Sequence, residues 1–143
     1  MNLSALLYAV GAFIFLAFAD FFLKLSAGRI SSSMNTLIYA VTAVLPAAIW
    51  VLWERLSNTT QLVTREGILT SIGVGLCFSL VVVFLSLTFA NGANLSVASP
   101  IIRLLGIVLA SSLGILVLGE AFSLRYALGV LLTFAGVYFI ITR

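Results

Sequence analysis

Histidine is absent from this chain of 143 residues, and cysteine occurs once, as Cys77 within an apolar run. Without histidine, neither a Ser-His-Asp nor a Cys-His catalytic arrangement can be built. The same shortage removes the usual ligands of zinc, haem and iron–sulfur clusters, so we expect no metal and no cofactor. One thiol cannot form an internal disulfide. Paired catalytic groups are not visible elsewhere in the sequence, and we therefore expect no enzymatic activity.

Charged residues are scarce as well. They make up only 8% of the chain, whereas hydrophobic residues make up 63%, and the mean hydropathy is +1.29. A soluble domain of this length needs more charge to cover its surface. The net charge of +3 comes from scattered residues, which cannot form a nucleic-acid-binding face. The composition therefore predicts an integral membrane protein in contact with the lipid bilayer and without a nucleic-acid partner.

Five apolar runs have about the 20 residues that a helix needs to cross the bilayer. No Lys or Arg precedes the first run, which argues against a cleaved signal peptide and predicts a permanent span. Because their polarity does not alternate, the runs favour helices over a β-barrel. We predict an all-α membrane protein, organised as a single domain over residues 1–143 without an internal repeat. The predicted spans are Leu3–Leu25, Asn35–Trp53, Gly67–Ala90, Ser96–Leu118 and Leu124–Thr142.

Small residues recur at every fourth position in two of these spans. The third span carries Ser71, Gly75 and Ser79, and the fourth carries Gly106, Ala110 and Gly114. Such stripes let helix backbones approach closely, either within one chain or between two chains. We favour packing within the chain for the first stripe. The second stripe lies in the most polar span and is also a candidate dimer interface.

The basic residues are divided almost evenly between the two faces of the membrane. We name the face at the N-terminal end side A and the opposite face side B. Side A receives Arg55, Arg65 and Arg125, and side B receives Lys24, Arg29 and Arg143, with Arg103 slightly inside the fourth span. The positive-inside rule fixes orientation only through a clear excess of Lys and Arg. One explanation of this balance is a single orientation with a weak charge bias, in which one Arg or an insertion partner decides the orientation. The balance is also explained by insertion in both orientations, which allows pairing with an inverted copy.

Two charges four residues apart lie in the first span, where Asp20 and Lys24 share one helix face. Asp20 lies about 7 Å inside the end of the span. Lys24 can extend its ammonium to the headgroups, whereas the shorter Asp20 cannot. A lone carboxylate in hydrocarbon costs roughly 2.5–3.5 kcal/mol, so Asp20 needs a partner, and we predict Arg103 at a similar depth. The three charges form either an ion-paired contact between helices or a substrate-binding or gating group.

Glu120 is the fourth charged candidate, at the side-A interface near Arg125. One interpretation is a surface ion pair, which contributes little to stability, and the other is a gating role. Asp20 is the one carboxylate within a predicted span. It is therefore the side chain that would couple transport to a proton or another cation.

Three short motifs follow one another in the C-terminal half. Ala98-Ser99-Pro100 opens the fourth span, Leu118-Gly119-Glu120 ends it, and Gly129 with Ala135-Gly136 lies in the fifth. From Phe89 to Ile141 this ordered set resembles the EamA-like domain of the drug/metabolite transporter superfamily. The first span, with a polar residue shortly before Phe-Leu-Lys, is similar to the opening helix of that family.

The resemblance implies a transporter built from five-helix units. Many members carry two such units in tandem and this sequence has one, which implies a homodimer or a partner membrane protein of similar size. The small multidrug resistance proteins are more distant relatives. Leu16 takes the place of their essential membrane glutamate, so their proton-coupled mechanism is not carried over.

These observations together predict a transporter in the cell membrane. We expect it to move a small molecule or metabolite by alternating access, as an antiparallel homodimer of dual topology. Since no nucleotide-binding loop is present, transport would be passive or ion-coupled. The alternatives are a structural subunit of a membrane complex that does not transport, and one half of a flippase for a lipid-linked metabolite.

Overall fold

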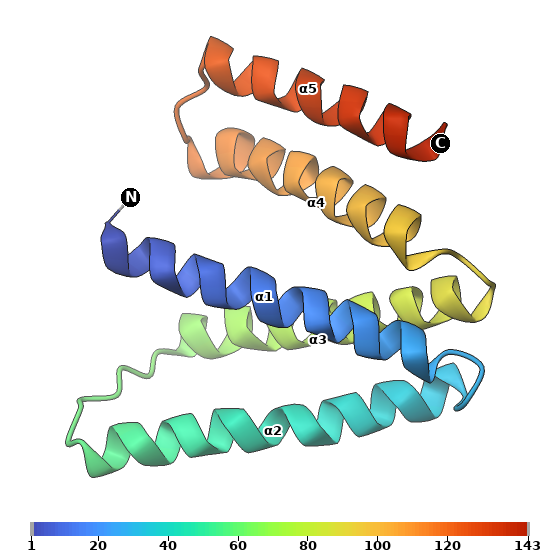
Figure 1. Cartoon of the computed structure of the whole chain (residues 1–143). Helices are drawn as coiled ribbons and strands as arrows, with labels where there is room; N and C mark the ends of the chain where they lie inside the picture. The colour runs from blue at the N-terminus through green and yellow to red at the C-terminus, as the bar shows by residue number, and fades with distance from the viewer. Residues whose placement is uncertain (1, 143) are drawn as a thin grey trace. The chain divides into compact units, whose positions relative to one another are not determined.

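The computed structural model describes residues 2–142, which form five α-helices (Figure 1). All five are long and apolar enough to cross a membrane. This confirms the prediction of an all-helical protein with five helices of membrane-spanning length. Met1 lies outside the described residues, as does Arg143, which was counted among the side-B charges. The helices are α1 (Leu3–Ser26), α2 (Ser32–Leu56), α3 (Arg65–Ala90), α4 (Leu95–Leu118) and α5 (Leu124–Ile141).

The predicted bounds of four helices are within two residues of the structure, and α2 differs more. This helix begins three residues before the predicted span and ends three residues after it. At its side-A end, Trp50 Nε1 donates a hydrogen bond to Glu54 Oε1 at 2.8 Å. This bond joins neighbouring turns of the helix and supports its last turn beyond the apolar run.

Pro100 lies inside α4 and does not open it. The predicted start of this span at Ser96 is within one residue of the start of α4 at Leu95, but Pro100 is the sixth residue of the helix and does not lie in the expected first turn. Proline has no N–H, so the carbonyl of Ser96 receives no helical hydrogen bond from position 100. The helix tolerates this loss near its N-terminal end.

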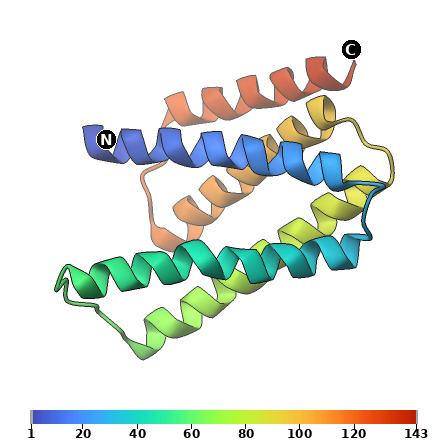
Figure 2. The same cartoon turned by 60° about the horizontal axis from the view of Figure 1, so that its bottom comes forward.

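The chain divides into two compact units, one up to Gly92 and the other from Ala93 onward. The first unit contains α1, α2 and α3, and α3 packs against both of the other helices. The C-terminal ends of α1 and α3 and the N-terminal end of α2 meet on one side of this unit, as Figures 1 and 2 show. These are the three helix ends that the topology assigns to side B. A turn over residues 27–31 connects α1 to α2, and Gly28 adopts a left-handed φ of 78° there.

Burial within the first unit is confined to its side-B half. The buried residues are Asp20 on α1 and Leu85, Ser86 and Phe89 on α3. By contrast, α3 is exposed from Arg65 to Phe78, and α2 has no buried residue. The buried residues of the first unit therefore lie near one end of its helices.

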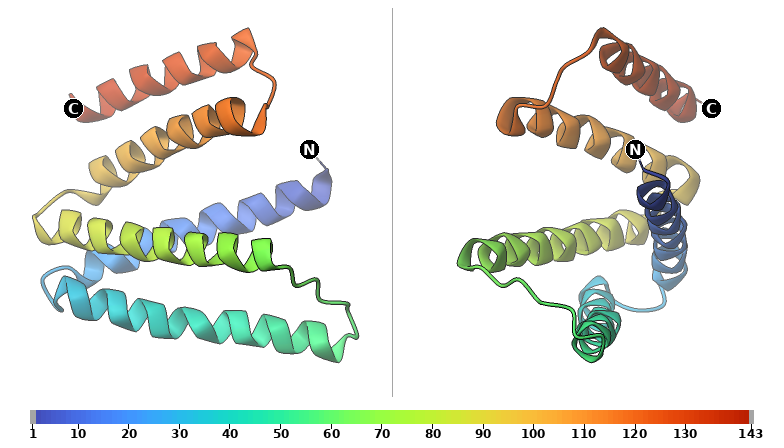
Figure 3. Two further views of the ribbon diagram at one scale, coloured as in Figure 1. Left: turned by 180° about the vertical axis from the view of Figure 1, so that it is seen from behind. Right: turned by 90° about the vertical axis from the view of Figure 1, so that its left-hand side faces the viewer.

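The second unit is an antiparallel pair of helices, α4 and α5, joined by residues 119–123 (Figure 3). Gly119 ends α4 with a left-handed φ of 69°, and the backbone N–H of Glu120 then donates to the carbonyl of Gly114 at 3.2 Å. Ser123 caps α5 by accepting a hydrogen bond from the N–H of Tyr126 at 3.2 Å. Both helix ends at this turn are thus satisfied locally. That these units act together as a single domain stays a prediction.

Candidate functional site

Polar and charged side chains gather at the side-B end of the first unit. We name Asp20, Lys24, Asn35, Ser86 and Phe89 the side-B cluster. They come from all three helices of the unit. Each lies within about two turns of a helix end at side B, because α1 and α3 end there and α2 begins there. The cluster combines a carboxylate, an ammonium, an amide, a hydroxyl and an aromatic ring.

Asp20 is the most buried charged residue of the described chain, with only 4% of its surface exposed. It lies six residues before the end of α1, which is about 9 Å along the helix axis. No buried side-chain nitrogen or oxygen within residues 2–142 lacks a hydrogen-bond partner. A buried carboxylate in a membrane-spanning helix is tolerated only when it faces protein or water. The burial of Asp20 therefore agrees with a protein-facing position.

Lys24 turns toward α3, where its ammonium nitrogen lies 5.6 Å from the centroid of the Phe89 ring. This is within the range of a cation–π contact. Phe89 is almost fully enclosed, at 2% exposure. The lysine was expected to reach the headgroups, and the structure shows a half-buried side chain that joins α1 to α3.

A hydrogen bond between side chains joins α2 to α3. Asn35 Nδ2 donates to Ser86 Oγ at 2.9 Å, and Ser86 is buried. Bonds of this kind contribute about 0.6 kcal/mol on average between membrane helices. The amide of Asn35 and the ammonium of Lys24 therefore connect α3 to its two neighbours through different chemistry.

Arg103 belongs to the second unit, eight residues after the start of α4, and is half-buried. An ion pair with Asp20 would join the two units, and this pairing stays a prediction. Eight residues of helix correspond to about 12 Å from the start of α4, and a depth similar to that of Asp20 stays a prediction.

Glu120, in the turn after α4, folds back over the end of that helix. A Cβ atom placed on Gly114 would lie 2.5 Å from Glu120 Oε2. The carboxylate therefore occupies the space that the glycine leaves, and Gly114 is buried as a result. Within the described chain, Glu120 and Arg125 form no ion pair that the structure records, so this turn is organised around Gly114. A gating role for Glu120 stays a prediction.

The remaining small residues of the predicted packing stripes are open. A Cβ at Gly75 or Gly106 would meet no atom within 4 Å, and Ala110 is exposed. The contact within the chain that was favoured for Gly75 is thus absent from its own unit. The prediction that Gly106, Ala110 and Gly114 form a dimer interface has no test here, and Gly114 already contacts Glu120 of its own chain.

Three members of the side-B cluster were not identified from the sequence, namely Asn35, Ser86 and Phe89. The sequence signal that could have identified two of them is their distance from the side-B ends of the helices. Asn35 and Ser86 are polar residues close to side B, as Asp20 and Lys24 are, and the depth argument used for Arg103 applies equally to them. Phe89 gave no such signal, because aromatic residues are common throughout these apolar runs.

The side-B cluster connects helices through the Asn35–Ser86 hydrogen bond and the Lys24–Phe89 contact. Its carboxylate and amide oxygens accept hydrogen bonds, and its ammonium and amide N–H groups donate them.

No match to this chain was found among protein-family models, curated proteins or solved structures.

Proposed function

We propose that this chain is a transporter that moves a small molecule or metabolite across the membrane by alternating access. The observation that carries the proposal is the buried Asp20 inside a helix of membrane-spanning length, near the same helix ends as the other polar residues of the side-B cluster. Ionisable residues within membrane spans are costly and are retained mainly where they serve substrate or ion pathways. The resemblance of residues 89–141 to the EamA-like domain supports the same function.

The transporter works as an antiparallel homodimer in this proposal. Two inverted five-helix units would place their clusters at opposite faces of the membrane, so that each face has one polar mouth. The nearly even division of Lys and Arg supports insertion in both orientations, because neither face carries a clear excess. Substrate would pass between the two mouths as the units rock.

Insertion in both orientations is tested by a reporter fused to the C-terminus. An alkaline phosphatase fusion is active only outside the cytoplasm, and a green fluorescent protein fusion is bright only inside it. We expect both fusions to be active at comparable levels. Activity of a single fusion would exclude the antiparallel homodimer. Adding two lysines to the turn at residues 27–31 should abolish one signal, which provides the control.

The role of Asp20 is tested by uptake into proteoliposomes. The compound that stabilises the purified protein most in a screen of amino acids, sugars, nucleosides and lipophilic drugs serves as the probe. We expect Asp20→Asn to fold normally and to lose at least tenfold in uptake, because the amide keeps the shape and removes the charge. Glu66→Gln, an exposed carboxylate at the side-A start of α3, is the matched control. Unchanged uptake by Asp20→Asn would contradict the proposal.

Loss of folding in Asp20→Asn, together with stable copurification of another membrane protein, would instead support a structural subunit. The contacts that favour this second function are the Asn35–Ser86 hydrogen bond and the Lys24–Phe89 contact. Both join helices directly, as expected of a rigid scaffold.

A further inference from the structure

The connection between α2 and α3, residues 57–64, turns back beside the two helices that it joins. Asn58 follows the end of α2 with a left-handed φ of 52°, and the backbone N–H of Thr59 donates to the carbonyl of Glu54 at 3.1 Å. These two features change the direction of the chain directly after the helix. Figures 1 and 3 show the start of α3 set back toward side B from the end of α2. The connection therefore runs inward from the side-A end of α2.

Two contacts place the second half of this connection beside the helices. Gln61 Nε2 lies 3.5 Å from the carbonyl oxygen of Val51, which is five residues, or about 7.5 Å, before the last residue of α2. Leu62 and Val63 line one groove together with residues of α3 as far as Ile72. Ile72 lies about 10 Å along the axis from the first residue of that helix. The connection is thus level with the outer turns of both helices.

These outer turns coincide with the edge of the hydrocarbon core. The apolar run of α2 ends at Trp53, and that of α3 begins at Gly67. Val51 and Ile72 therefore both lie within the apolar runs. The headgroup layer on each face is about 5–8 Å thick, because the bilayer measures about 40–45 Å and its hydrocarbon core about 30 Å. A segment that contacts Val51 and shares a groove with Ile72 lies within this layer.

The side chains of the connection suit the headgroup layer. Residues 57–64 carry no charge, and the nearest charges, Arg55 and Arg65, belong to the flanking helices. Leu62 is 93% exposed and Val63 is 70% exposed, so residues 2–142 cover neither side chain. Acyl chains would remove this apolar surface from water without a protein partner.

We propose that residues 57–64 are embedded in the headgroup layer of the side-A leaflet, with Leu62 and Val63 inserted to the edge of the acyl chains. The partner of this surface is the lipid bilayer. Irregular backbone cannot lie in hydrocarbon, where its polar groups have no partner, so the backbone stays among the headgroups. A polar connection between two spans is ordinarily expected in water, and the proposal changes that depth. It does not rest on transport activity and holds for either orientation of the chain.

Spin-label accessibility measures the depth of this segment. A nitroxide is attached to Leu62→Cys in a Cys77→Ser background, and the full chain is reconstituted in vesicles of phosphatidylethanolamine and phosphatidylglycerol. Molecular oxygen concentrates in lipid, whereas nickel ethylenediaminediacetate stays in water, so the ratio of the two collision rates increases with depth. Thr59→Cys, directly after α2, is the control. We expect the ratio at position 62 to exceed that at position 59 about fivefold, because the edge of the acyl chains lies between them.

Two results at position 62 would overturn the proposal. A ratio equal to that at position 59 would show that the connection lies in water. Low collision rates with both reagents would show that protein, such as a second copy of the chain, covers Leu62.

A substitution beside the label tests whether the apolar side chains hold the segment in the membrane. In the chain labelled at position 62, we expect Val63→Asp to lower the ratio about twofold, because a carboxylate resists transfer into lipid. Val63→Leu keeps the apolar character and should leave the ratio unchanged. An unchanged ratio with Val63→Asp would contradict the proposal. If Val63→Asp fails to fold, the comparison of positions 62 and 59 still decides.

Discussion

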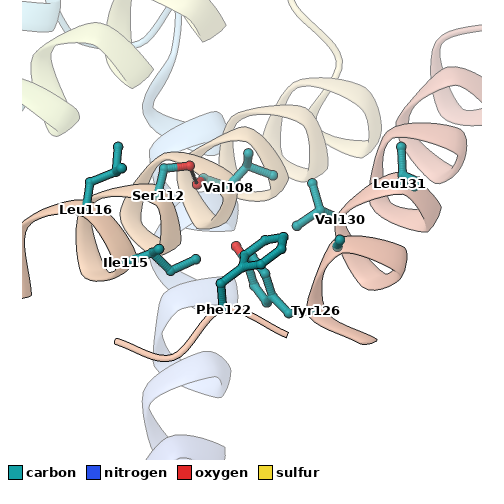
Figure 4. Close-up of a pocket in the computed structure, with 9 residues that line it drawn as sticks. Val108, Ser112, Ile115, Leu116, Phe122, Tyr126, Val130 and Leu131 are labelled. Atoms are coloured by element: carbon teal, nitrogen blue, oxygen red, sulfur yellow. Dashed lines mark hydrogen bonds between the residues drawn. The ribbon is translucent and has the colours of Figure 1, made fainter. Parts of the chain in front are cut away.

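The two units of this chain hold their helices together in different ways. In the first unit, polar and charged side chains reach from one helix to the next, as in the Asn35–Ser86 hydrogen bond and the Lys24–Phe89 contact. In the second unit, Ser111, Ser112 and Thr133 each donate to a carbonyl of their own helix. The side chains that face each other between α4 and α5 are mainly apolar, and they line an apolar pocket (Figure 4). Direct polar contacts specify which helix faces meet, whereas apolar contacts in lipid specify them only weakly.

The comparison predicts that the largest stability change follows the loss of the Phe89 ring. Phe89→Ala should lower the free energy of unfolding by about 2 kcal/mol, less than in soluble proteins because lipid leaves mainly the cavity term. Val137→Ala, the matched change at the buried apolar residue of α5, should cost about 1 kcal/mol. Unfolding by sodium dodecyl sulfate in mixed micelles measures both values. Equal losses would remove this distinction between the units.

A smaller effect is expected from the hydrogen bond between α2 and α3. Asn35→Ala and Ser86→Ala should each destabilise the protein, and the double variant should reveal a coupling energy of about 0.6 kcal/mol. The same unfolding measurement provides the four values of the cycle. Ser112→Ala is the control from the second unit and should be nearly neutral, because its hydroxyl bonds only to its own helix. A coupling energy of zero would show that the bond does not join the helices.

The smallest effect is expected at the end of α4, and its sign depends on Glu120. Gly114→Ala should be nearly neutral in the unmodified chain, because the gain in helix propensity is offset by displacement of the Glu120 carboxylate. In a Glu120→Ala background the same change should stabilise the protein by about 0.5 kcal/mol. Thermal unfolding in detergent compares the two backgrounds. Identical effects in both would show that Glu120 does not occupy the space above Gly114.

The sequence predicted the helices well because the bilayer leaves few choices. A run of about 20 apolar residues must satisfy its backbone internally, so its type and length follow from composition. The ends of α2 were less predictable. Ser33 and Glu54 are polar, yet the helix continues past both, since backbone hydrogen bonding does not stop where the hydrocarbon ends. Pro100 misled for a related reason, because proline near a helix start can be accommodated after the first turn.

The candidate site was predicted only in part. Asp20 and Lys24 were identified because a charge stands out in an apolar run. The partners of a membrane helix depend on which face meets which neighbour, and no periodic pattern distinguished those faces here. Ser86 resembled any other small residue of α3, and Asn35 resembled the polar start of a span. Their hydrogen bond required the three-dimensional arrangement of α2 and α3.

In the first unit the buried residues lie only near the side-B ends of the helices, so the helices are held together mainly at that end. The side-B cluster fixes one end of α1, α2 and α3, while the opposite end of α3 is exposed. A helix of 24 residues such as α1 is about 36 Å long, so a tilt of about 5° at the side-B end moves its far end by roughly 3 Å. A small rotation at side B is thereby amplified into a displacement of atomic size at side A. Motion of this first unit should therefore be read from distances at its side-A ends.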